Sequence, residues 1–334
     1  MMYDTMIIGG GIAGCVCAGA LACEGLQVIL VEKEPQLGGK VAKLGCKATD
    51  ACSNCGVCLS AGLWEKTASD SRITVCCGAW LLDCRGGDGG FEVTVSFGGK
   101  SGVVGAKKIV VATGYTDAGV ESGTHVELSG GHVLTGAQLE TMIRDRAPGI
   151  FAREPGSIAF LQCYGSRDKL QKALYCSRVC CAYAARSARL VKMLYPGCRV
   201  DMYFMDIQRI GRGCSEDELA ADGINILRGR PEKVVGSGGK VVVRFEHDGI
   251  RQSEYDCVVL SCGIAPGKDN EWLGELFGLG TDQDGFLTEV LPGDRTGVYI
   301  AGCAKGPGRI EEAYADALGV AARLCGSLKG VASA

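Results

Sequence analysis

Two groups of cysteines have a spacing that suits metal binding. In the first, Cys163 follows an apolar run, and Cys176, Cys180 and Cys181 open a helical pattern that continues to about Leu194. If Cys176 and Cys180 lie one turn apart on a helix, Cys163 can approach the same face from its strand end, and four thiolates converge as a [4Fe–4S] cluster requires. Inert buried thiols and a structural zinc site are the alternatives. Adjacent cysteine ligands strain a compact zinc more than a larger cube, which favours iron–sulfur.

The second group lies nearer the N-terminus and comprises Cys46, Cys52, Cys55 and Cys58. Its last three members form the C-x2-C-x2-C run of ferredoxins, and Cys46 is the candidate fourth ligand. The cysteine before proline that usually completes such a run is absent. We expect a second [4Fe–4S] cluster here. Zinc bound by the same thiolates and a C-x-x-C redox disulfide are the alternatives, of which the disulfide fits three evenly spaced cysteines poorly.

The first element that must position these groups is a strand, a glycine-rich turn and a helix at the N-terminus. Tyr3–Ile8 is a short apolar run, and a helical pattern ends at Cys23. Between them lies a G-x-G-x-x-G turn, whose glycines permit the turn, the backbone approach to a pyrophosphate and the packing of helix on strand. The acidic residue that ends the next strand suits a ribose hydroxyl. The candidate dinucleotide contacts are Gly9, Gly11, Ile12, Ala13, Gly14 and Glu32.

Together with this motif, the run from Lys33 to Lys40 resembles the FAD-binding start of the flavin-dependent disulfide reductases. Lys108–Gly114 resembles the element that closes their FAD domain, and Gly297–Gly302 resembles the strand that leads to the flavin. That family places Asp after this last glycine to bind the ribityl chain, whereas Cys303 stands here, so the contact would pass to backbone N–H groups. The resemblance implies these further FAD contacts: Lys33, Gly39, Lys40, Ala112, Thr113, Gly114, Gly302 and Cys303.

FAD-domain segments at both ends of a chain with an inserted middle are the arrangement of the thioredoxin-reductase-like fold. We therefore expect an α/β protein with two Rossmann-like domains, the second inserted in the first, and cysteine-rich cluster-binding segments. The predicted FAD domain comprises residues 1–150 and 268–334, and the inserted module comprises residues 151–267. Its strand Ser157–Gln162 is not followed by the glycine fingerprint, so we expect a cluster there in place of NAD(P)H.

The inserted module resembles a more specific family. Gly165–Asp168, Tyr175–Cys181, Tyr203–Asp206 and Arg228–Gly229 look like the A-type subunits of heterodisulfide reductase and their shorter homologues, and the likeness extends to Ala301–Pro307. Full-length archaeal members have an extra N-terminal domain and ferredoxin-like modules, so we expect a short, core-only version. The resemblance implies four cluster ligands, namely Cys163, Cys176, Cys180 and Cys181.

These features predict an electron-transfer subunit of a heterodisulfide-reductase-like complex, in which electrons pass between FAD, clusters and partner subunits. The resemblance implies cysteine-rich B- and C-type subunits or a quinone-linked module as partners, homodimerisation, and a place in disulfide- or sulfur-linked energy metabolism. A self-sufficient NAD(P)H-dependent flavin disulfide reductase and a non-catalytic zinc-bound flavoprotein are the alternative functions.

Composition argues against other classes of protein. The net charge is −3 without a run of like charges, so there is no basic footprint for nucleic acid. No apolar stretch reaches the roughly 18 residues of a membrane helix, and we expect no direct membrane insertion. The N-terminus lacks a secretory signal, and 20 cysteines in a reducing compartment indicate ligated or reduced thiols, which predicts a cytoplasmic protein. None of the three histidines has an oriented partner, so we expect no catalytic side chain.

Overall fold

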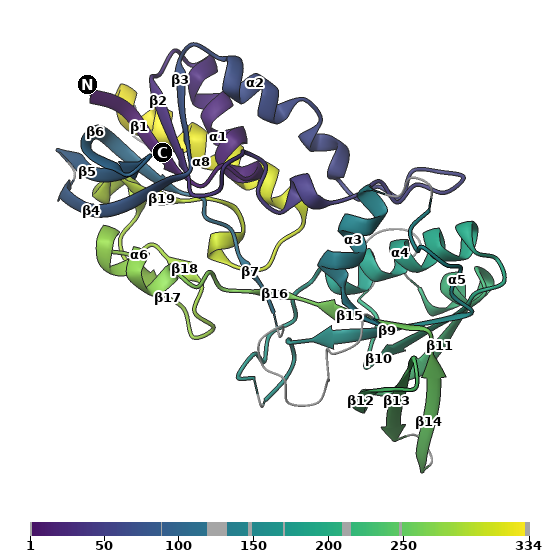
Figure 1. The fold of residues 1–334 in the computed structure, drawn as a ribbon. Coiled ribbons are helices and arrows are strands. Elements are labelled where there is room, and N and C mark those ends of the chain that lie inside the picture. The colour runs from purple at the N-terminus through teal and green to yellow at the C-terminus, as the bar shows by residue number, and fades with distance from the viewer. Residues whose placement is uncertain are drawn as a thin grey trace. The chain divides into compact units, whose positions relative to one another are not determined.

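The structure is a computed structural model that describes residues 2–87, 89–118, 132–145, 149–169, 171–208, 215–246 and 249–330. The chain divides into two compact units, of which the second is inserted in the first (Figure 1). The first unit comprises Met1–Ala42, Gly56–Thr116 and Pro266–Ala334, and the second comprises Lys43–Cys55 and Asp117–Ala265. Each unit has its own mainly parallel sheet with helices, so the predicted α/β class with two Rossmann-like domains is confirmed.

The first unit is built on a seven-stranded sheet with the order β3-β2-β1-β6-β5-β4, and β19 pairs with β6. The strands around β1 run parallel, whereas β4, β5 and β6 form an antiparallel meander. The burial of β5 alternates along the strand, as expected for a meander with one covered face. The strands are β1 (Met2–Ile8), β2 (Val28–Glu32), β3 (Ile73–Cys77), β4 (Ala79–Gly87), β5 (Gly90–Phe97), β6 (Lys100–Val111) and β19 (Val298–Ile300).

Two helices of the first unit, α1 and α8, pack against one another and against one face of its sheet. α1 consists largely of alanine, glycine, cysteine and valine, and these small side chains let it lie close to the strands. On the opposite face, α6 contributes Leu273 and Phe277 to a second core. The remaining elements of this unit are short. The bounds are α1 (Ile12–Cys23), η2 (Val57–Ser60), α2 (Leu63–Ser69), α6 (Asn270–Phe277), β17 (Gly280–Thr281), β18 (Leu287–Thr288), α7 (Gly293–Thr296), η3 (Gly302–Lys305) and α8 (Ile310–Lys329).

The second unit has a five-stranded parallel sheet with the order β11-β10-β9-β15-β8. Helices α3, α4 and α5 bury their apolar faces on one side of it, and the antiparallel strands β12, β13 and β14 cover the other. The parallel strands are β8 (Val133–Thr135), β9 (Ser157–Tyr164), β10 (Arg199–Phe204), β11 (Ile224–Arg228) and β15 (Cys257–Cys262). The other elements are α3 (Gly136–Arg144), α4 (Cys180–Leu194), α5 (Glu216–Ala221), β12 (Pro231–Ser237), β13 (Lys240–Glu246) and β14 (Ile250–Tyr255). Three short elements lie near the unit boundaries: η1 (Val41–Lys43), β7 (Thr116–Asp117) and β16 (Ile264–Ala265).

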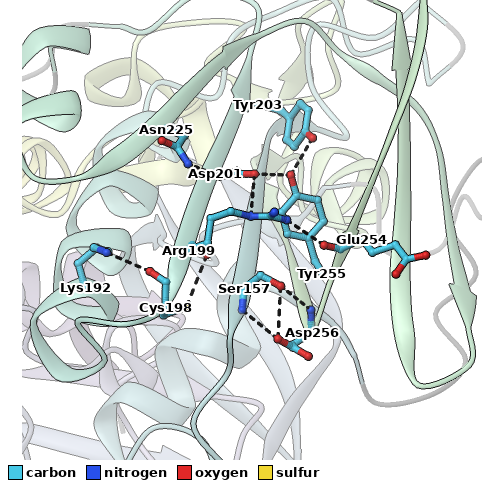
Figure 2. Close-up of polar contacts among 10 residues, drawn as sticks. All are labelled: Ser157, Lys192, Cys198, Arg199, Asp201, Tyr203, Asn225, Glu254, Tyr255 and Asp256. Atoms are coloured by element: carbon cyan, nitrogen blue, oxygen red, sulfur yellow. Dashed lines mark hydrogen bonds and ion pairs between the residues drawn. The ribbon is translucent and has the colours of Figure 1, made fainter.

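A buried polar cluster joins the two sheets of the second unit (Figure 2). The Tyr255 hydroxyl of β14 donates to the Asp201 carboxylate of β10 at 2.6 Å and lies 2.8 Å from the Tyr203 hydroxyl. Asn225 of β11 donates to the same carboxylate at 2.7 Å. Burial, together with the bond to Asp201, raises the pKa of Tyr255 far above its usual range. The cluster therefore ties three strands together with neutral tyrosines around one carboxylate.

The unit boundaries differ from the predicted domain limits at 150/151 and 267/268. The structure places residues 117–150 in the second unit because β8 pairs in parallel with β15, and the helix that follows it, α3, packs in the core of that unit. Lys43–Cys55 also belongs to the second unit. Among the described residues, no helix is both long and apolar enough to cross a bilayer.

Candidate functional site

Three of the four cysteines of the first group meet at the carboxyl end of the second unit's sheet. Cys163 lies near the end of β9, and Cys180 and Cys181 form the first turn of α4. The Cys180 thiol is hydrogen-bonded to both of the others, and all three residues are buried. Cys163 has a φ of 58°, at the point where the register between β9 and β15 shifts, and this irregularity re-aims its side chain.

The three thiols differ in acidity because they share hydrogen bonds. The bond from Cys180 lowers the pKa of Cys163 and lowers that of Cys181 to about 7, although burial acts in the opposite direction on both. The same two bonds, together with burial, raise the pKa of Cys180 well above its usual range. Arg167 is close enough to lower the pKa of Cys163 further, and it forms an ion pair with Asp206 at 2.5 Å. Two of the three sulfurs are thus biased toward the thiolate form that binds metal.

The predicted helical spacing of Cys176 and Cys180 is wrong. α4 begins at Cys180, and Cys176 lies in the preceding loop. Arg178 has a φ of 62°, a left-handed conformation that no helix interior contains, so the helix cannot extend back to Tyr175. The Arg178 N–H donates to the Cys176 sulfur at 3.3 Å, which fixes that half-buried side chain by a local turn. Within the described residues, no set of three or more His, Cys, Asp or Glu side chains has the arrangement of a metal site.

Two serine hydroxyls beside these cysteines are buried without a partner. Ser166 and Ser177 are fully buried, and neither Oγ atom has a hydrogen-bond partner among the residues that the structure describes. The Ser166 N–H donates to the Cys163 carbonyl at 3.3 Å, which closes a turn directly after the first cysteine. An unsatisfied buried hydroxyl costs roughly 1–3 kcal/mol. A bound group that accepts hydrogen bonds from these hydroxyls, as the sulfurs of a cluster can, would offset that cost.

The second cysteine group lies mostly on a segment of the second unit that is held by a buried ion pair. Lys47 donates to Glu140 of α3 at 2.6 Å and to the Gly45 carbonyl at 2.9 Å, and its side chain is 2% exposed. Arg186 of α4 donates to the carbonyls of Ser53 and Asn54. Both contacts flank cysteines of the segment. Cys46 and Cys52 are exposed and Cys55 is half-buried, while Cys58 is exposed in η2 of the first unit.

The predicted dinucleotide site lies at the carboxyl end of β1 in the first unit. Gly9 has a φ of 105°, and a Cβ there would lie 2.5 Å from the Ala112 carbonyl oxygen, so no other residue fits this turn. A Cβ at Gly14 would overlap the Gly9 carbonyl, because α1 packs directly on the loop. Beside Gly11, an added Cβ would meet no atom within 4 Å. The first turn of α1, which contains Ile12 and Ala13, therefore begins next to open space suited to an anion.

Glu32, at the end of β2, faces this glycine-rich loop. Its buried carboxylate accepts from the N–H of Gly10 at 2.5 Å and from the N–H of Glu34 at 2.8 Å. A carboxylate offers about four acceptor positions, so two remain for a ligand. The geometry leaves room for the predicted bond to a ribose hydroxyl.

The other predicted flavin contacts surround the same loop, with one exception. The Gly38 N–H donates to the Gly10 carbonyl at 2.8 Å, which places Gly39 beside the loop, and Lys40 lies 5.3 Å from the centre of the Tyr115 ring. Ala112 at the end of β6 donates its N–H to the Ile8 carbonyl, and the chain then turns through Thr113 and Gly114. Lys33 is instead exposed and forms an ion pair with Asp269 at 3.2 Å.

An acidic residue that the sequence did not predict lies by Gly302. Asp316 of α8 accepts from the Gly302 N–H at 2.7 Å and from Lys305 at 2.5 Å. The Cys303 thiol donates to the Gly308 carbonyl at 3.5 Å, so this side chain is engaged by its own loop. The family's usual Asp is replaced at its position by cysteine, while a carboxylate from α8 reaches the preceding glycine. The position of Asp316 along α8 indicates this contact only once the packing of α8 is known.

Comparisons with known proteins agree with this architecture. Residues 7–44 match the family described as NAD(P)-binding Rossmann-like domain. The chain is 37% identical, over 238 residues, to the A-type subunit of the H(2):CoB-CoM heterodisulfide,ferredoxin reductase of Methanothermobacter marburgensis, which covers 64% of this chain and 36% of the relative. It is 27% identical, over 426 residues, to one of the A-type iron-sulfur subunits of the CoB–CoM heterodisulfide reductase of Methanopyrus kandleri, covering 97% of this chain and 64% of the relative. The resemblance to the A-type subunits of heterodisulfide reductase is confirmed.

The chain spans less than two thirds of the length of these relatives. The longer alignment exceeds the 334 residues of this chain, so the relative has additional residues within the aligned stretch. Among solved structures, the thioredoxin reductase of T. acidophilum has a TM-score of 0.69 and 18% identity, with 99% of both chains covered. That likeness confirms the fold.

Proposed function

We propose that this chain is an FAD- and [4Fe–4S]-containing electron-transfer subunit of a heterodisulfide-reductase-like complex. The observation that carries the proposal is the buried hydrogen-bonded contact among Cys163, Cys180 and Cys181. It lies at the carboxyl end of a parallel sheet, where ligands of α/β folds bind. The names of the relatives, which are A-type and iron-sulfur subunits of heterodisulfide reductases, support the same function.

The first unit would hold FAD. Its pyrophosphate would lie at the start of α1 beside Gly11, and the free acceptor positions of Glu32 would bind the ribose. Gly39, Lys40 and the turn after β6 would line the flavin side. FAD, when bound, exchanges electrons singly or in pairs. The residues of the chain orient the cofactor and supply backbone donors to its phosphates.

The first cluster would be bound by Cys163, Cys180 and Cys181, with Cys176 from the loop as fourth ligand. The lowered pKa of Cys163 and of Cys181 favours ligation, and Arg167 and the N-terminus of α4 offset the negative charge of thiolates. Cys176 would approach the cluster from the loop, separately from the adjacent Cys180 and Cys181 on α4. A bound cluster carries one electron at a time.

The second cluster remains a proposal from spacing, with Cys46, Cys52, Cys55 and Cys58 as its ligands. The buried Lys47–Glu140 pair and the bonds from Arg186 support it, because they fix the backbone on either side of Cys46 and between Cys52 and Cys55. Thiols that are exposed or half-buried, on a backbone fixed by these contacts, are suited to bind a cluster.

The proposed partners are cysteine-rich B- and C-type subunits or a quinone-linked module, with homodimerisation of this chain. The Cys163–Ser166 turn occupies the place where reductases of this fold have a glycine-rich pyrophosphate loop, so we propose that electrons do not enter as hydride from NAD(P)H. Electrons would instead pass between flavin, clusters and partners.

Anaerobic purification tests this function. We expect FAD, about eight iron atoms and as many acid-labile sulfides per chain, an EPR signal on reduction, and no bleaching of the flavin by NADH. Cys180→Ser should remove about four of the iron atoms and leave the flavin content unchanged. Zinc in place of iron would favour the non-catalytic zinc-bound flavoprotein, and NADH bleaching would favour a self-sufficient disulfide reductase.

A further inference from the structure

The two serines with unpartnered hydroxyls lie in the two chain segments that contain Cys163 and Cys176. Ser166 ends the turn that starts at Cys163, and Ser177 directly follows Cys176. Both side chains are completely buried, and in the described part of the chain each Oγ atom lacks a hydrogen-bond partner. Two such hydroxyls in one small region carry a free-energy cost that a folded protein normally avoids.

Gly263 shows that the two hydroxyls converge. A Cβ at this position would overlap the Ser177 Oγ and would lie 3.3 Å from the Ser166 Oγ. The φ of Gly263 is not in the left-handed region, so its backbone alone does not demand glycine. The missing side chain at Gly263 therefore provides the room in which both hydroxyls lie.

The nearby backbone acceptors are already engaged. The Tyr183 hydroxyl donates to the Cys262 carbonyl, and the Tyr175 hydroxyl donates to the Ile264 carbonyl, both at 2.9 Å. The Gly263 carbonyl accepts from the Ala118 N–H at 3.0 Å. Each of these carbonyls accepts a hydrogen bond from another donor, and within the described part of the chain neither serine hydroxyl donates to them.

We propose that Ser166 and Ser177 donate hydrogen bonds to sulfur atoms of the cluster held by the first cysteine group and thereby raise its reduction potential. Reduction adds negative charge to the sulfurs, so a donor stabilises the reduced form more than the oxidised form. This inference rests on the proposed function. It assigns to these residues the control of how readily the cluster accepts an electron.

The test is an EPR-monitored redox titration of the purified full chain, of three test variants and of one control variant. We expect a more negative midpoint potential in Ser166→Ala and Ser177→Ala at unchanged iron content. Gly263→Ala keeps both hydroxyls but displaces them, and it should shift the potential in the same direction. The matched control is Thr5→Val in the first unit, because Thr5 also has a buried hydroxyl without a partner among the described residues. The midpoint potential of the cluster in this variant should equal that of the wild type.

Urea unfolding of the cluster-free chain provides a second readout. Because the hydroxyls have no acceptor without the cluster, Ser166→Ala and Ser177→Ala should leave the cluster-free chain at least as stable as the wild type. A wild-type potential in both variants with full iron content would overturn the proposal. So would a loss of cluster-free stability, since the hydroxyls would then bond to each other or to buried water. Zinc in the wild-type chain would instead refute the proposed function itself.

Discussion

Replacing Lys47 by methionine would remove one half of an ion pair that is almost completely buried. The Lys47 and Glu140 side chains are 2% and 6% exposed, with 2.6 Å between nitrogen and oxygen. Removal of one partner from a buried pair costs about 3–5 kcal/mol, because the other charge is left without compensation. The pair joins the 43–55 segment to α3, so the cost falls first on the docking of this segment. A penalty of that size lowers the docking equilibrium by roughly a hundred- to a few thousand-fold.

Two measurements follow the release of the segment. Hydrogen exchange should rise in residues 43–55 while β9, β10 and β15 keep their protection. Iron analysis should show loss of about four atoms per chain, those of the second cysteine group, with the EPR signal of the first group retained. Lys329→Met is the matched control, since Lys329 and Glu24 form a similarly short pair at the surface, at 2.7 Å, and this variant should match the wild type.

A double substitution separates the pair's charge from its packing. Lys47→Met combined with Glu140→Leu leaves no unpaired charge, and we expect it to regain most of the protection that Lys47→Met loses. The reasoning fails if Lys47→Met keeps wild-type exchange in residues 43–55. It also fails if the double variant is as unprotected as the single one, because the cost would then arise from shape and not from the buried charge.

Three further predictions concern other parts of the chain. Gly9→Ala should yield protein with little bound FAD, measured by flavin absorbance, because its φ of 105° and the contact with the strand end leave no room for a methyl group. Tyr255→Phe should lower the free energy of unfolding in urea by about 1–3 kcal/mol, since the buried Asp201 carboxylate loses a hydrogen-bond donor. An unchanged urea midpoint would contradict the stabilising role of the tyrosine–aspartate hydrogen bonds in Figure 2. The hydrogen bond from Lys240 holds the pKa of Asp256 below its usual 3.8. The ionised Asp256 carboxylate therefore stabilises the folded state above the unfolded-state pKa, and this stabilisation is lost as the pH falls through the folded-state pKa. Asp256→Asn should therefore flatten the acid end of the stability profile below about pH 4, and identical profiles would count against this account.

Local patterns were sufficient to predict the strand and the helix on either side of the glycine-rich loop. The apolar run before Gly9 and the helical pattern that ends at Cys23 correspond closely to β1 and α1. These elements are specified by neighbouring residues, so a periodic pattern and a turn signal determine them. The same reasoning identified Cys163, Cys180 and Cys181 as a group, because their strand and helix are each local.

The remaining features depend on residues that are far apart or on one unusual backbone angle. Ser177, Arg178 and Val179 are compatible with a helix in sequence, and the left-handed φ of Arg178 separates Cys176 from it. Lys47 and Glu140 are 93 positions apart and give no pattern in the sequence. The domain limit was misplaced for the same reason, since β8 finds its partner β15 more than a hundred residues later.

The contacts of α4 connect the two cysteine groups. Cys180 and Cys181 form its first turn, and Arg186, about 9 Å further along the helix axis, binds carbonyls that lie between Cys52 and Cys55. One helix therefore holds the start of the first group and the backbone between Cys52 and Cys55 of the second, whereas Cys58 belongs to the first unit. Under the proposed function, α4 keeps the part of the second group on residues 43–55 at a constant distance from the first group, because a packed α-helix does not change length. The potential of the first cluster and this helical connection would together influence how electrons pass between the two groups.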